Sequence, residues 1–306
     1  RYYMEISVII PTYDDEKDLK ECLNSLQNQT EDFELIIVDG HSSDDTVKIA
    51  DENGAKVTYE EYGTRGGACN VGAEESEGDL LVFTDADATF PKDWLRKVKE
   101  KFEETGADVV GGNDIVKSGS NFEKDLFAID KAKEVPEGKD VWKRVRGVNS
   151  AYKREVFLEN KFDPDLNSIE ESELHYRLHK RGYELIFDPD IIVYHHRRRS
   201  FKALAKQFFR NGKGRMQVIK KHSGMFDFGL DLAPLGLFAV FWIFLGLSFR
   251  HWLFSIGFLG ILGLVFLLLP LNICRKAEEW EAFRTLIIAY PLRWFSFCLG
   301  YLRGAF

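Results

Sequence analysis

The stretch that decides the fold reads Leu80-Leu81-Val82-Phe83-Thr84-Asp85-Ala86-Asp87. Its first five residues are apolar or β-branched, which is typical of a buried strand. Two carboxylates, Asp85 and Asp87, follow directly at the end of that strand. Side chains at this spacing can ligate one hard divalent cation, and that cation can in turn hold a diphosphate. Because Asp-x-Asp is also common in surface loops, its meaning depends on the rest of the chain.

Strands and helices are predicted to alternate around this stretch. Strands are expected at the short apolar or β-branched runs Ile6–Ile10, Phe33–Val38, Lys56–Tyr59, Leu80–Thr84 and from Val109 onward. Helices are expected between them, at Leu19–Leu26, Asp45–Ile49, Ala68–Glu77 and Lys92–Glu104. This alternation, with short loops, predicts an α/β domain built on a mostly parallel sheet that helices flank.

Acidic loops follow three of the predicted strands, at Pro11–Asp15, Asp39-Gly40 and Asp85–Asp87. The carboxyl ends of parallel strands lie at one edge of a sheet, and ligands bind in the crevice outside that edge. We therefore expect the three loops to line one binding site.

Charge divides the chain into two regions. Residues 1–190 contain 44 acidic and 25 basic side chains, a net charge of −19, whereas residues 191–306 contain 5 acidic and 16 basic ones, a net charge of +11. Ten basic residues and no acidic residue lie within 197–221. This asymmetry indicates two regions in different surroundings. The four cysteines are widely spaced and form no metal-binding pattern, which favours a reducing compartment.

Apolar runs in the C-terminal region predict transmembrane helices. Residues 232–249 and 252–273 are uncharged and long enough, or nearly so, to cross a bilayer. Residues 283–305 are apolar but contain three arginines, so they are expected to form either a third span or an interfacial helix. A buried helical hairpin in a soluble protein is the alternative, but the abundance of Leu and Phe with few polar faces favours lipid.

We therefore expect an α/β domain at 1–194, a basic juxtamembrane segment at 195–229 and a membrane domain at 230–306. Basic residues precede the first span and follow the second at Arg275-Lys276, whereas only Arg250 lies between the two. The positive-inside rule then places the α/β domain on the cytoplasmic side of a multi-pass cell-membrane protein. A basic run can also bind nucleic acid, but the adjoining apolar runs favour membrane lipids or a lipid-linked phosphate as the partner.

Eight motifs occur in order between residues 4 and 215. They are Val8–Glu16, Ile37–Thr46, Arg65–Gly72, Phe83–Asp87, Gly147–Arg154, Ile169–Leu174, Tyr194–Arg197 and Gln207–Arg210. In this order and spacing they resemble glycosyltransferase family 2, in which the opening block usually reads Val-Ile-Ile-Pro-x-Tyr-Asn-Glu. Asp14 replaces the usual Asn, and Asp15 stands where Glu is common. The resemblance implies the GT-A fold and a nucleotide-diphosphate sugar as the donor.

The resemblance also assigns roles around the diphosphate. Asp85, Asp87 and His195 would hold Mn²⁺ or Mg²⁺, which stabilises the negative charge of the leaving diphosphate. Further nucleotide-sugar contacts are expected from Pro11, Thr12, Tyr13, Asp15, Asp39, Arg65, Asn70, Asp85 and Arg210. Asp39 would accept a hydrogen bond from the base, which favours uracil; as an alternative it caps a turn. Tyr13 would stack on the base or simply pack in its loop, and Arg65 would offset diphosphate charge or stay solvated.

The acceptor hydroxyl must lose a proton during transfer. In the family the second acid of a Glu-Asp block is the usual base, and Glu171 matches that position, although Glu replaces the commoner Asp. Acids at a helix start also complement the helix dipole, a role that fits Glu170 and Glu173 better than Glu171. Because the block departs from the family pattern at this position, Glu170 is the alternative base. A single base without an evident nucleophile is consistent with inversion at the anomeric carbon.

The function expected from these observations is a membrane-anchored, metal-dependent, inverting glycosyltransferase. Its acceptor would be a hydroxyl of a membrane-associated, polyprenyl-linked glycan. One alternative is a polyprenyl-phosphate sugar synthase, whose acceptor phosphate is already ionised. A second alternative is a non-catalytic membrane scaffold that keeps the fold. Arg210 is followed by Asn211 where processive synthases have Trp, which argues against a polysaccharide polymerase.

Overall fold

The computed structural model describes residues 4–116, 120–131, 141–196, 200–248 and 252–305. The chain divides into two compact units. Unit 1 comprises Arg1–Lys117 and Val135–His196, and unit 2 comprises Ser118–Glu134 and Arg197–Phe306. Two residues used in the sequence predictions, Arg197 of the seventh motif and Arg250 between the apolar runs, lie outside the described residues.

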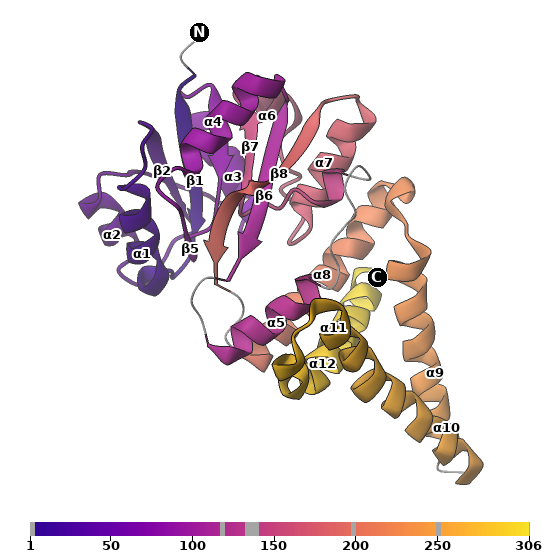
Figure 1. Ribbon diagram of the computed structural model, residues 1–306. Helices are drawn as coiled ribbons and strands as arrows, with labels where there is room; N and C mark the ends of the chain where they lie inside the picture. The colour runs from indigo at the N-terminus through magenta and orange to yellow at the C-terminus, as the bar shows by residue number, and fades with distance from the viewer. Residues whose placement is uncertain (1–3, 117–119, 132–140, 197–199, 249–251, 306) are drawn as a thin grey trace. The chain divides into compact units, whose positions relative to one another are not determined.

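A mixed eight-stranded sheet is the centre of unit 1 (Figure 1). Its strands are β1 (Ile6–Thr12), β2 (Glu34–Asp39), β3 (Lys56–Tyr59), β4 (Leu80–Phe83), β5 (Ala88–Thr89), β6 (Val109–Ile115), β7 (Ser150–Lys153) and β8 (Leu185–His195). The strand order is β3-β2-β1-β4-β7-β6-β8-β5. The first four strands are parallel, as predicted. Because β7 pairs antiparallel with both β4 and β6, and β5 pairs antiparallel with β8, the rest of the sheet is mixed.

Helices cover both faces of the sheet, as the sequence predicts. One face packs against α1 (Glu16–Leu26), α2 (Thr46–Glu52) and α4 (Trp94–Thr105). The other packs against α3 (Arg65–Glu75), α6 (Arg154–Asn160) and α7 (Glu170–Lys180). Strand β1 supplies both cores, because Val8 and Ile10 point to the first face and Ile9 to the second. All three side chains are fully buried, which explains the continuous apolar run of β1.

Unit 2 is helical. It contains α5 (Asn121–Lys131), α8 (Phe201–Lys221), α9 (Ala233–Ser248), α10 (Trp252–Gly263), α11 (Leu269–Ala277) and α12 (Phe283–Ala305). Short 3₁₀ or π segments connect them at Ser223–Met225, Phe228–Leu232, Leu264–Leu268 and Trp280–Ala282, and one more, Val141–Lys143, lies in unit 1. The hydrophobic core of unit 2 joins α5 to α8, α11 and α12. Helix α5 lies within the predicted N-terminal domain of the sequence, yet it packs in unit 2.

Helices α8 and α12 approach each other closely. A Cβ added to Gly212 would lie 2.0 Å from the carbonyl oxygen of Phe297, and one added to Gly300 would lie 1.9 Å from that of Phe209. Only glycine fits at both positions, because a methyl group there would overlap the backbone of the facing helix.

Two helical stretches of unit 2 are long and apolar enough to cross a membrane by length and composition. They are Ser255–Ala277, with 23 residues, and Trp280–Ala305, with 26 residues. The sequence left 283–305 open between a span and an interfacial helix, and its helix meets the length required for a span. The first predicted span, 232–249, contains a shorter apolar helix, Pro234–Leu247.

Candidate active site

The sheet brings the predicted motifs to one edge. Thr12 of β1 and Asp39 of β2 are register partners at the carboxyl ends of their strands. β4 ends at Phe83, so Asp85 and Asp87 lie in the loop beyond the same edge. Strand β8 reaches this loop from the other side of the sheet, because its last residue, His195, pairs with Ala88. Residues far apart in the sequence therefore meet there.

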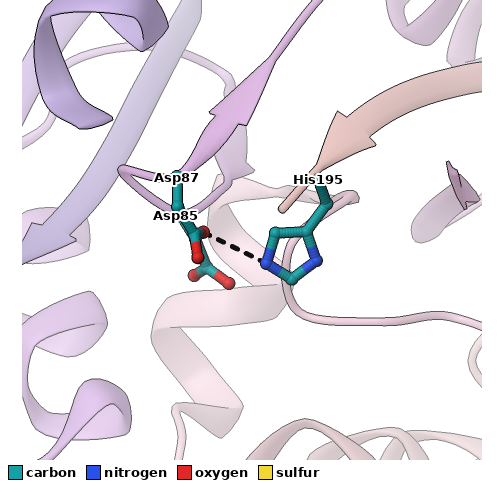
Figure 2. Close-up of side chains that lie close together, drawn as sticks. All are labelled: Asp85, Asp87 and His195. Carbon is teal, nitrogen blue, oxygen red and sulfur yellow. Dashed lines mark ion pairs between the residues drawn. The ribbon is translucent and has the colours of Figure 1, made fainter. Parts of the chain in front are cut away.

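Three predicted metal ligands form a cluster at this edge. Asp85, Asp87 and His195 can each offer one ligand atom, and these atoms lie within 4.8 Å of one another (Figure 2). Nε2 of His195 lies 3.1 Å from Oδ1 of Asp87. Two carboxylate oxygens and one imidazole nitrogen suit Mn²⁺ better than Mg²⁺, which prefers oxygen ligands alone. The donor set therefore fits a divalent cation, with Mn²⁺ favoured.

Acidic groups surround His195 on both sides. Burial favours the neutral ring, but the carboxylates of Asp114 and Asp87 outweigh it and raise the pKa of His195 to about 9. Nδ1 of the ring lies 3.6 Å from Oδ2 of Asp114, whose Oδ1 is 3.4 Å from Nε of Arg146. The sequence did not single out Asp114 or Arg146, because β6 lies next to β8 only in the folded sheet.

Arg65 connects the Asp-x-Asp loop to the acidic block of α7. Its Nε donates to Oδ1 of Asp85 at 2.8 Å, and its Nη1 lies 3.4 Å from Oε1 of Glu170. A third bond runs from Nη2 to the carbonyl oxygen of Gly147 at 3.0 Å. Burial disfavours the charged guanidinium. The surrounding acids outweigh it and raise the pKa of Arg65 well above its usual value, with Asp85 making the largest contribution. Arg65 is therefore a fixed, partly buried cation.

Glu170 and Glu171 begin α7. The residue before them, Ile169, has φ 69°, a left-handed conformation that is strained for a β-branched residue. Glu170 is 5% exposed and turns to Arg65. Burial, with a smaller contribution from the like charge of Glu170, raises the pKa of Glu171 to about 7. The two acids thus have different surroundings, as residues about 100° apart on a helix should.

The residues predicted to contact the nucleobase lie at or just after the carboxyl ends of β1 and β2. Tyr13 is 65% exposed. Asp15 accepts from the backbone N–H of Tyr13, and burial together with Asp87 raises its pKa to about 6. Asp39 is buried and accepts from the hydroxyl of Thr12 at 3.1 Å and from the backbone and hydroxyl of Ser42. Those contacts are the turn-capping role of Asp39; contact with a base stays a prediction.

Three further residues were predicted to contact the nucleotide sugar: Pro11, Asn70 and Arg210. Pro11 lies within β1, where it is register partner of Val38. The amide of Asn70 donates to the carbonyl of Phe162 and accepts from its N–H, each at 2.9 Å, so Asn70 ties α3 to the loop before α7. Arg210 belongs to unit 2, whereas the metal cluster belongs to unit 1, and its contact with the nucleotide sugar stays a prediction.

An α/β sheet with a strand-end Asp-x-Asp pair and an adjoining acidic helix start defines the class of the protein: a glycosyltransferase of the GT-A fold. Residues 7–159, half of the chain, match glycosyl transferase family 2, and the chain belongs to that family.

Curated relatives are similar over most of the chain. Glycosyltransferase AglE of Haloferax volcanii is 32% identical over 70% of this chain and 73% of its own. A dolichyl N-acetyl-α-D-glucosaminyl phosphate 3-β-D-2,3-diacetamido-2,3-dideoxy-β-D-glucuronosyltransferase of Methanococcus voltae is 27% identical over 98% of this chain and 96% of its own.

Solved structures share the fold. The mannosyltransferase PcManGT of Pyrobaculum calidifontis, in complex with GDP-Man and Mn²⁺, superposes with a TM-score of 0.58 at 19% identity over 99% of this chain and 86% of its own. Staphylococcus aureus TarS with UDP-GlcNAc gives a TM-score of 0.54 at 19% identity over 94% of this chain and 92% of its own.

Proposed function

We propose that this enzyme transfers a sugar, with inversion, from a nucleotide-diphosphate sugar to a hydroxyl of a lipid-linked glycan at a membrane. The observation that carries the proposal is the double contact of Arg65. It holds Asp85 of the candidate metal cluster at 2.8 Å and lies 3.4 Å from Glu170 at the start of α7. Arg65 thus links the proposed leaving-group site to the helix start that carries the proposed base, and direct displacement at an anomeric carbon requires the two to lie close together.

The donor side stabilises the departing diphosphate. Asp85, Asp87 and His195 would hold the divalent cation, which supplies positive charge to the diphosphate as it leaves. Arg65 adds a fixed cation on the side facing α7. Because its guanidinium is already oriented by Asp85 and the Gly147 carbonyl, little reorganisation is needed when negative charge develops.

The acceptor side removes a proton. Glu171 has a pKa of about 7, so near neutral pH it is partly ionised and basic enough to accept a proton from a hydroxyl. Glu170 is the partner of Arg65 and, as a neighbouring negative charge, raises the pKa of Glu171. We assign the base to Glu171 and an electrostatic role to Glu170.

The acceptor class rests on similarity and on the C-terminal helices. The Methanococcus voltae relative, similar over nearly the whole chain, carries a dolichyl sugar phosphate in its name. Two stretches of this chain are long and apolar enough to span a bilayer. A multi-pass protein with its catalytic unit on the cytoplasmic side meets both a soluble nucleotide sugar and a lipid-linked acceptor.

The identity of the donor's nucleobase is the most specific part of the proposal. We favour uracil, since Tyr13 is exposed for stacking, Asp15 lies in the same loop and Asp39 ends the neighbouring strand β2. Solved neighbours hold both kinds of donor, GDP-Man in PcManGT and UDP-GlcNAc in TarS.

A polyprenyl-phosphate sugar synthase is the second candidate. A dolichol-phosphate mannosyltransferase of Pyrococcus furiosus is 32% identical over 38% of this chain and 35% of its own. Its acceptor class would need no base, because a phosphate is already ionised at neutral pH.

The test is a transfer assay with the full-length chain in detergent and Mn²⁺. UDP- and GDP-sugars are each offered with a polyprenyl phosphate and with a polyprenyl-diphosphate-linked saccharide. Transfer to the saccharide supports the proposal, and analysis of the new linkage reports inversion. Transfer to the bare phosphate alone favours the synthase, and donor consumption that is absent with every acceptor contradicts both. Full-length protein that stays soluble without detergent contradicts the membrane assignment.

A further inference from the structure

The imidazole of His195 has one ring nitrogen that the metal cluster does not use. Nε2 faces Asp87, whereas Nδ1 points away from the two aspartates (Figure 2). Nδ1 is buried, and among the residues that the structure describes no hydrogen-bond partner lies within reach of it. Its near neighbour is Oδ2 of Asp114 at 3.6 Å, a few tenths of an ångström beyond hydrogen-bond distance.

The sheet places Asp114 beside His195 on one face. Asp114 of β6 is register partner of Val193 in the parallel strand β8. His195 lies two residues beyond Val193, so its side chain emerges on the same face as that of Val193. Asp114 is consequently a diagonal neighbour of the imidazole across two adjacent strands, and its side chain is only 6% exposed.

An irregularity in the β6–β8 pairing creates this alignment. Gly112 pairs with Asp188, but the next residue, Asn113, pairs with Ile192. The bulge requires glycine, since a Cβ on Gly112 would lie 2.0 Å from the carbonyl oxygen of Ile191. The amide of Asn149 bridges the bulge by donating to the carbonyls of Asn113 and Ile191 at 2.8 and 2.9 Å. Bulges of this kind re-aim side chains next to active sites.

The carboxylate of Asp114 is buried and contacts Arg146 and His195. Arg146 approaches the other oxygen of Asp114 at 3.4 Å, but its side chain is 45% exposed. A metal-binding histidine must present a deprotonated nitrogen to the metal, and it keeps that tautomer when its second nitrogen donates to a carboxylate. Oδ2 of Asp114 faces the nitrogen of His195 that would be the donor.

We propose that Asp114 is the positioning residue of the metal site. It accepts a hydrogen bond from Nδ1–H of His195, fixes the tautomer with a bare Nε2 and holds the ring with Nε2 toward Asp87. The inference rests on the proposed metal-dependent function, in which Nε2 is a ligand. Asp114 itself contacts neither the cation nor the sugar.

The experiment measures binding of Mn²⁺ alone to the full-length chain in detergent. Free Mn²⁺ is counted by electron paramagnetic resonance, so the readout is independent of transfer activity. Asp114→Asn preserves the shape and removes the charge, and it should weaken Mn²⁺ binding about 10–100-fold. Asp188→Asn is the matched control: Asp188 is a partly buried acid of β8 that pairs with Lys101, and its loss should leave Mn²⁺ binding unchanged.

A thermodynamic cycle separates positioning from a general loss of structure. In the His195→Ala background Asp114→Asn should cause no further loss, because its effect passes through the imidazole. Additive losses in the cycle would overturn the proposal, as would wild-type affinity in Asp114→Asn. If Asp114→Asn does not fold, Asp114→Ser is the second variant, and the same outcomes decide.

The two proposals fail in different ways. Mn²⁺ binding by the wild type that depends on His195 but not on Asp114 overturns the positioning role and leaves the function intact. A wild type that binds no Mn²⁺ overturns the metal-dependent function and the positioning role together. Arg146→Gln that reproduces the full loss of Asp114→Asn would show that the ion pair, not the histidine contact, is what matters.

Discussion

Replacing Glu171 by Gln should lower the transfer rate about 10²–10⁴-fold, which is the contribution of a positioned general base. Gln keeps the size of the side chain and its place at the start of α7, and it removes only the basicity. Donor binding should change little, because Arg65 contacts Glu170 and Asp85 rather than Glu171.

The pH dependence of the wild type follows from the raised pKa of Glu171. The protonated acid cannot accept a proton, so the rate should rise with pH through the pKa of about 7. For one group of that pKa the ionised fraction grows from about one tenth at pH 6 to about nine tenths at pH 8, a roughly tenfold increase in kcat/KM. The kcat/KM of Glu171→Gln should not show this rise with pH.

Glu170→Gln is the internal control. Glu170 is a like charge that raises the pKa of Glu171. Glu170→Gln should therefore shift the rise of kcat/KM to lower pH and leave transfer measurable at pH 8. The assay is transfer of a radiolabelled sugar over a pH series at saturating Mn²⁺. If Glu170→Gln loses transfer activity and Glu171→Gln keeps it, the base is Glu170. If neither variant differs from the wild type, the acceptor is an anion and the reasoning for a hydroxyl is refuted.

Three further predictions test the site and the packing. Asp87→Ala should abolish transfer with the fold intact; activity that persists in this variant and in chelator would contradict metal catalysis. Arg65→Lys, which keeps the charge but loses the three-way fork, should lower kcat about 10²–10³-fold, the effect of removing a preorganised donor; an unchanged kcat would exclude this role. Gly300→Ala should destabilise unit 2 by about 1–3 kcal/mol, since the methyl meets the carbonyl of Phe209, and lower its melting temperature in detergent, whereas Gly246→Ala, with no neighbour within 4 Å of its added Cβ among the described residues, should not.

Local pattern was enough to predict the four parallel strands β1 to β4 and the helices between them. Buried parallel strands consist of consecutive apolar residues. Two such runs are Val8–Ile10 and Leu80–Phe83. Amphipathic spacing predicted α1, in which Leu19, Cys22, Leu23 and Leu26 are all buried. The Asp-x-Asp pair was readable because a strand end fixes the direction of the residues that follow it.

Pairing between distant strands decided the rest, and no local signal records it. The short strands β5 and β7 were not predicted, although β7 reverses the direction of the sheet between β4 and β6. Helix α5 interrupts the unit 1 sequence and packs in unit 2, where Leu126 joins the core of α8, α11 and α12.

The same distinction holds within the site. The sequence by itself determined the chemical types: two aspartates at a strand end, an arginine just before a predicted helix and paired glutamates at a helix start. Only the tertiary structure decided that Arg65 joins Asp85 to Glu170 and that Asp114 faces His195. The physical reason is that side-chain type and periodicity are local properties of the chain, whereas contact between remote segments depends on strand order, register and bulges throughout the sheet.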